Sequence, residues 1–183
     1  MFKEKIKDKN VLASLGCASV IFVLGVFILI GPVLQIQDFS LVYPLFFGIY
    51  ALAELIIFSL SYQRKEYTSF FSFLISFLLF ILTFVFDLTS RPNIIAFSLL
   101  LWILVNALVK LKRADYYHDK KSRMWTVEIV LLIIFFISGI MTSMNFAWGE
   151  TAQILNLGYF VLICGILKIV ELLILYLTKG KLK

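Results

Sequence analysis

The first hydrophobic run of the chain is residues 11–33, VLASLGCASVIFVLGVFILIGPV. It contains no charged residue and follows a basic segment, residues 1–10, MFKEKIKDKN. An α-helix rises 1.5 Å per residue, so about 20 apolar residues cross the hydrocarbon core of a bilayer. The run is too long for the core of a signal peptide and long enough to span. We therefore predict a retained transmembrane helix.

Five further apolar runs of similar length follow, at residues 41–61, 69–88, 93–111, 125–143 and 154–177. Hydrophobic residues make up 62% of the 183 residues and charged residues 15%, against about 45–50% and about 25% in soluble domains. The connections between runs are short, as antiparallel neighbouring helices require. These observations predict an all-α membrane protein in which residues 1–183 form one domain of six transmembrane helices.

Basic residues mark one side of this predicted bundle. They gather in the N-terminal segment, around the second and fourth connections and in the C-terminal segment, whereas the opposite connections hold only Arg91. Cytoplasmic segments carry the excess of Lys and Arg, so both termini are predicted to be cytoplasmic. The net charge of +6 is then expected to meet anionic lipids of the cytoplasmic leaflet, and not nucleic acid, because no soluble domain is expected to hold a strand.

Two of the spans contain a similar stretch. GIYALAEL at residues 48–55 matches GILKIVEL at residues 165–172, with Gly and Glu at corresponding positions, and Asn106 occupies the same place in the fourth run. This match indicates a helical hairpin used three times, over residues 11–61, 69–111 and 125–177. Short connections alone would produce a similar spacing, so the repeat remains one of two interpretations.

The predicted spans contain a few ionisable or strongly polar residues, namely Glu54, Asn106, Glu128, Lys168 and Glu171. A charge at the bilayer centre costs at least about 2.5–3.5 kcal/mol, so such residues face protein and often serve function. Lys168 and Glu171 are three residues apart, so they share a helix face and can pair. The set could form a proton-accepting or ligand-binding site in the cytoplasmic half, or it could hold the helices together. We interpret the set as holding the helices together, and the site is the alternative.

Gly25, Gly48, Gly139 and Gly165 are expected to let helix backbones approach closely. No nucleotide-binding glycine loop or hydrolase motif is present in the sequence, which predicts a protein without enzymatic activity or cofactor. His118 lies between Asp115 and Asp119, and we interpret the three as a mixed-charge turn, not as ligands of a metal ion.

Three stretches resemble the HdeD-like small membrane proteins: residues 25–32, 47–54 and 110–125. The resemblance implies a six-helix protein of the bacterial cytoplasmic membrane, without known enzymatic activity and linked to acid or envelope stress tolerance. The middle hairpin departs from the pattern, because Thr83 and Asn106 stand where a Gly and an acid are expected.

An alternative function is the substrate-binding subunit of a vitamin or small-solute transporter, which also has about this size and six helices. Such subunits typically dock a coupling protein through two alanines four residues apart in the first helix. Here Ala13 and Ala18 are five residues apart, so that face does not form. A purely structural or assembly-assisting membrane protein is the third possibility.

Overall fold

The computed structural model describes residues 2–33, 41–61, 67–85, 92–144 and 150–179, and over these residues the chain is helical with no strand. The six helices are α1 (Phe2–Ile30), α2 (Val42–Ser61), α3 (Tyr67–Val85), α4 (Pro92–Asp119), α5 (Met124–Met144) and α6 (Glu150–Lys179). Each contains a stretch long and apolar enough to cross a membrane. The prediction of an all-α protein with six such helices is confirmed, while the hairpin repeat and the cytoplasmic termini stay predictions.

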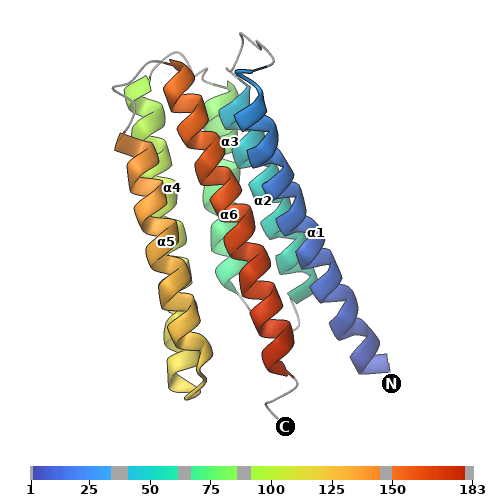
Figure 1. Ribbon diagram of the computed structural model, residues 1–183. Helices are drawn as coiled ribbons and strands as arrows, with labels where there is room; N and C mark the ends of the chain where they lie inside the picture. The colour runs from blue at the N-terminus through green and yellow to red at the C-terminus, as the bar shows by residue number, and fades with distance from the viewer. Residues whose placement is uncertain (1, 34–40, 62–66, 86–91, 145–149, 180–183) are drawn as a thin grey trace.

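The helices stand side by side and form a closed ring, in which each packs against its two neighbours in the chain and α6 returns to α1. Helix α1 begins and α6 ends at the same end of the bundle (Figure 1). The most extensive contacts are α1 with α6, α2 with α3, and α4 with α5. The tightest pairs therefore join one predicted hairpin to the next, and the two helices within each hairpin pack less closely.

Aromatic rings fill the centre of the ring of helices. Trp102 of α4 is fully buried and meets Tyr50 of α2 with 4.8 Å between ring centroids, Phe46 at 5.2 Å, and Phe135 and Phe160 at 6.0 Å each. Most of these pairs are edge-on, the arrangement that the ring quadrupole favours. The rings come from α2, α4, α5 and α6, so one aromatic core joins four helices.

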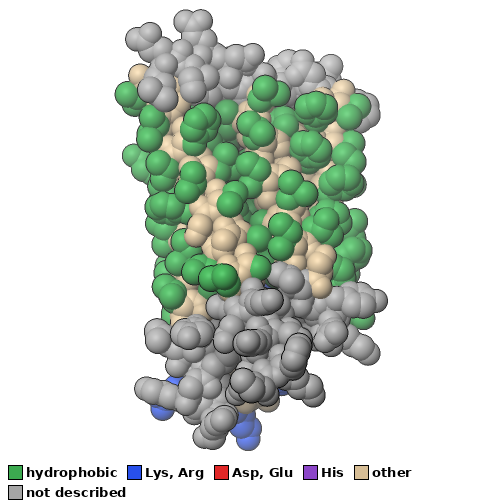
Figure 2. Space-filling view, turned by 90° about the vertical axis from the view of Figure 1, so that its right-hand side faces the viewer, with side chains coloured by type: hydrophobic (Ala, Val, Ile, Leu, Met, Phe, Trp, Pro, Cys, Tyr) green, Lys and Arg blue, Asp and Glu red, His purple; other side chains and the backbone are tan. Residues whose placement is uncertain are grey.

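The outer surface is apolar as well. Figure 2 shows hydrophobic side chains covering the middle zone of one face of the molecule. Helix α3 illustrates the pattern, because its buried residues are mostly hydroxyl-bearing (Ser69, Ser72, Ser76, Leu79 and Thr83). Its exposed residues are Phe and Leu side chains such as Phe77, Leu78 and Phe84. Polar groups inside and apolar groups outside are what a lipid environment requires.

Candidate functional site

Six charged side chains gather in the half of the bundle where α1 begins and α6 ends. They are Glu54 of α2, Lys110 and Arg113 of α4, Glu128 of α5, and Lys168 and Glu171 of α6. We call this group the ionic cluster. Because α2, α4 and α6 end there and α5 begins there, their alternating directions bring together residues that lie far apart in the sequence.

Two sets of ion pairs tie α6 to its surroundings. The Lys168 amine donates to Oε1 of Glu54, which links α6 to α2. The Arg113 guanidinium donates to Oε1 of Glu171, and the Lys110 amine lies 3.5 Å from its Oε2, which links α6 to α4. Both carboxylates are buried, so these pairs have little water around them and hold three helices together.

The ion pair of Lys168 with Glu171 that their spacing allows is not formed, because each side chain has its ion-pair partner on another helix. The two residues share a face of α6, and their side chains reach partners on α2 and α4, respectively. Sequence reasoning also missed two members: Lys110 was counted with the basic residues around the fourth connection, and Arg113 lies beyond the predicted helix end at residue 111. Their separation of three residues was an available signal for a shared helix face.

The ionic cluster rests on the aromatic core. The Lys168 amine lies 4.4 Å from the centroid of the Tyr50 ring, and the Lys110 amine lies 5.8 Å from that of Phe135. Both distances suit a cation–π interaction, which gains strength away from water. Lys110 and Lys168 are therefore each close to both a carboxylate and an aromatic ring.

Glu128 is the exception within the ionic cluster. Its side chain is 0% exposed, and neither carboxyl oxygen has a hydrogen-bond partner among the described residues. Its electrostatic neighbours are Glu171, Arg113 and Lys110. A buried polar group without a partner is unfavourable and usually indicates strain, a catalytic or redox role, or an unseen water or ion.

Asn106, the fifth predicted residue, belongs to a different network, between α3 and α4. Ser72 donates its hydroxyl to Oδ1 of Asn106, and Asn106 donates from Nδ2 to the backbone oxygen of Trp102 at 2.9 Å. The Trp102 indole in turn donates to Ser76 at 2.7 Å. The 3–4 spacing of Ser69, Ser72 and Ser76 was the signal in the sequence that could have located this network.

Ser72→Ala is expected to lower the free energy of unfolding by about 0.6 kcal/mol and at most about 1.7 kcal/mol, the range measured for hydrogen bonds between membrane helices. Ser69→Ala is the matched control, because Ser69 is equally buried on the same helix but its hydroxyl has no partner within the described residues. Denaturant titration of both variants in detergent measures the difference. Equal losses of unfolding free energy in the two variants would show that the hydrogen bond between Ser72 and Asn106 does not stabilise the protein.

The predicted glycines all lie where two helices touch. A methyl group added at Gly25 would lie 2.6 Å from the Cα atom of Leu162, and one at Gly165 would lie 2.6 Å from that of Phe22. Gly48 faces the Phe80 ring at 3.0 Å and Gly139 faces the Ile103 side chain at 2.9 Å by the same measure. The first two permit backbone contact between α1 and α6, and the other two accommodate side chains.

Metal ligation is not evident in the part of the chain that the structure describes, where no three His, Cys, Asp or Glu side chains stand close enough to hold an ion. His118 instead packs edge-on against Trp125, with 5.4 Å between ring centroids.

Comparison with known proteins finds no matching family model, no matching curated protein and no matching solved structure. The resemblance to HdeD-like proteins therefore rests on the sequence stretches alone.

Proposed function

We propose that this protein is a non-enzymatic, proton-responsive protein of the bacterial cytoplasmic membrane that contributes to acid or envelope stress tolerance. The observation that carries the proposal is Glu128, a fully buried carboxyl group without a hydrogen-bond partner among the described residues, next to a set of ion pairs. The resemblance to HdeD-like proteins implies the same kind of role. Ionisable residues inside membranes commonly mark proton relays.

A proton on Glu128 changes the charge balance of the ionic cluster. With Glu128 ionised, three carboxylates face three cations, and with Glu128 protonated one positive charge is in excess. The nearest groups affected are Glu171, Arg113 and Lys110, which form the link between α4 and α6. Proton uptake thus changes the charge balance at the ion pairs between α4 and α6. Acidic pH would alter the packing of the helices in this way.

Deleting the gene is expected to reduce survival of the host bacterium after acid challenge, and Glu128→Gln is expected to reduce it to a similar extent. The amide keeps the size of the side chain but cannot take up the proton. Because an amide carries no charge to bury, the variant is expected to unfold at the same denaturant concentration as the wild type or a higher one. Survival counts at low and neutral pH, with the purified variants titrated in parallel, measure both effects.

Unchanged survival of the deletion strain would contradict the stress role. Full survival of a folded Glu128→Gln variant would instead show that Glu128 is not the proton site. Copurification of an ATPase complex or a tightly held vitamin would favour the alternative of a transporter subunit.

A further inference from the structure

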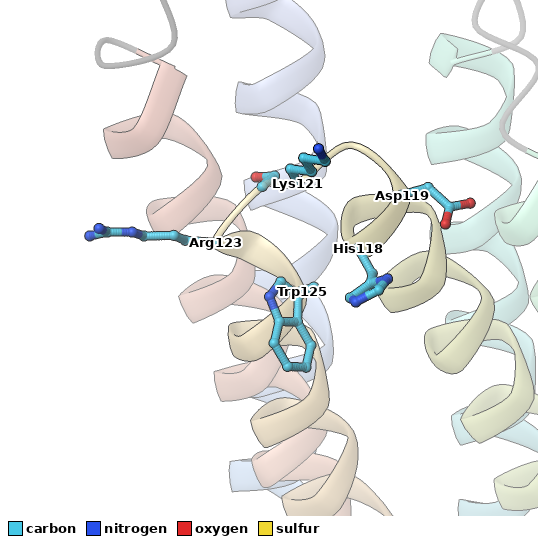
Figure 3. A pocket seen from close by; sticks show the side chains of 6 residues that line it. His118, Asp119, Lys121, Arg123 and Trp125 are labelled. Carbon is cyan, nitrogen blue, oxygen red and sulfur yellow. The ribbon is translucent and has the colours of Figure 1, made fainter.

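Two adjoining hollows lie where α4 passes into α5. The first, of about 510 Å³, is lined by polar and charged side chains together with Trp125: His118, Asp119, Lys121, Ser122 and Arg123 (Figure 3). The second, of about 550 Å³, has apolar walls made by Leu108, Leu111, Ala114 and Ile129, with Lys112 and Asp115 at its margin. Both hollows are also lined by His118 and Trp125, so they lie side by side, and we call them together the double pocket.

We propose that this double pocket binds an anionic phospholipid, with its phosphate near Lys121 and Arg123 and an acyl chain along Leu108, Leu111 and Ile129. A polar compartment that opens into an apolar groove matches the two halves of such an amphiphile. The groove runs beside residues that face outward on a membrane-spanning helix, since Leu108 and Leu111 are exposed. An acyl chain can therefore enter from the bilayer without crossing water.

The charges around the double pocket suit a phosphodiester. Lys112, Lys121 and Arg123 oppose Asp115 and Asp119, which leaves one positive charge in excess before any contribution of His118. Figure 3 shows Arg123 and Asp119 on opposite sides of the His118–Trp125 pair. Lys121 lies between the two in this view, so a phosphate beside Arg123 stays away from the Asp119 carboxylate.

The turn that carries these residues is closely defined. The amides of Lys121 and Ser122 donate to the carbonyls of His118 and Tyr117, which is the Schellman arrangement that ends a helix. The Ser122 hydroxyl then accepts from the Met124 amide at 3.3 Å and caps the start of α5. Because both helix ends are capped within a few residues, the polar compartment is held in position by the backbone.

Lys121 occupies a position in this turn that normally belongs to glycine. Its φ is 51°, in the left-handed region, which costs a residue with a Cβ atom about 1–2 kcal/mol. Strained residues of this kind are concentrated at ligand-binding sites. A lysine at this position adds a basic side chain to the lining of the polar compartment, which a glycine would not.

Trp125 joins the two compartments. Its side chain is partly exposed, and its ring packs edge-on against His118. Tryptophan is enriched at the level of lipid headgroups because its ring is apolar and its N–H is polar. The boundary between the polar and apolar compartments therefore coincides with the residue type that marks the boundary of the bilayer.

The test uses the purified full-length protein in detergent, mixed with equal amounts of phosphatidylglycerol and phosphatidylcholine, with retained lipid measured by native mass spectrometry. The wild type is expected to retain mainly phosphatidylglycerol. Lys121→Gln and Arg123→Gln are each expected to reduce its retention about five-fold, the effect of one basic residue near an anionic surface. Equal retention of the two lipids by the wild type would overturn the proposal.

Lys120→Gln is the matched control. It removes the same charge from the same turn, but the Lys120 amine donates to the Tyr116 hydroxyl and lies 4.3 Å from the centroid of that ring. Retention is expected to stay at the wild-type value. A loss equal to that of Lys121→Gln would show a diffuse surface charge in place of a site, and would overturn the proposal.

The apolar groove has its own pair of variants. Leu108→Trp is expected to fill the groove and reduce retention, whereas Leu104→Trp, on the same helix but outside the groove, is not. A site for phosphate alone would lose binding with Lys121→Gln but not with Leu108→Trp, and that result would overturn the lipid assignment. This inference goes beyond the proposed stress role, because lipid retention is measured without acid challenge and Glu128 does not line the double pocket.

Discussion

Glu54→Leu is expected to lower the free energy of unfolding by about 3–5 kcal/mol, the usual cost of removing one partner from a buried ion pair. The substitution leaves the Lys168 amine in a site where its side chain is only 13% exposed. Contact with the Tyr50 ring compensates only in part, since it offers no formal charge. Denaturant titration in detergent, followed by circular dichroism, measures the loss.

The double variant Glu54→Leu with Lys168→Met tests the cause of this loss. Replacing both charges by apolar side chains of similar size is expected to restore stability to within about 1 kcal/mol of the wild type or to exceed it. A loss of less than about 1 kcal/mol in the free energy of unfolding of Glu54→Leu would mean that the Lys168 amine contacts water or Glu171 instead. The Glu54–Lys168 pair would then not hold α2 to α6.

The number and type of the helices could be predicted from the sequence because the bilayer leaves few choices. A run such as residues 11–33 must satisfy its backbone groups internally, and a helix is the simplest way to do so. The ends of the helices were predicted less accurately from the sequence. Helix α4 continues to Asp119 through Lys112 and Arg113, because Lys and Arg are good helix formers outside the membrane as well as at its edge.

The ionic cluster could be predicted in part only. Burial of Glu54, Glu128, Lys168 and Glu171 follows from their place in apolar runs, and the structure brings these four together. Their partners do not follow, because a charge pairs with whichever helix lies beside it. Periodicity within one helix does not encode the order of helices in the ring.

The role of Asn106 shows the same limit. It was grouped with the acids because it occupies the corresponding place in the fourth span, yet its hydrogen bonds join α4 to α3. Its partner on α3 is Ser72, and the inward position of Ser72 depends on which face of α3 meets α4. That face is polar, and a search for apolar stripes alone does not reveal it.

Gly25→Leu is expected to lower the free energy of unfolding by about 3 kcal/mol, the upper end of the usual range for overpacking. In the contact between α1 and α6, the most extensive in the bundle, Gly25 lies against the backbone of Leu162. Gly165 lies against the backbone of Phe22, so the two helices approach each other at reciprocal positions. Backbone atoms cannot rotate away as a side chain can, so the added side chain must push the helices apart.

Gly16→Leu is the matched control, because it adds the same side chain to the same helix at a position with no atom within 4 Å of the new Cβ. It is expected to change the free energy of unfolding by less than about 0.5 kcal/mol. Gly139→Ala is a second comparison, since the added methyl group meets the movable end of Ile103 and a smaller loss follows. Similar unfolding midpoints for Gly25→Leu and Gly16→Leu in detergent would mean that α1 does not pack against α6 through Gly25. The ring of six helices would then not close at the seam between these two helices.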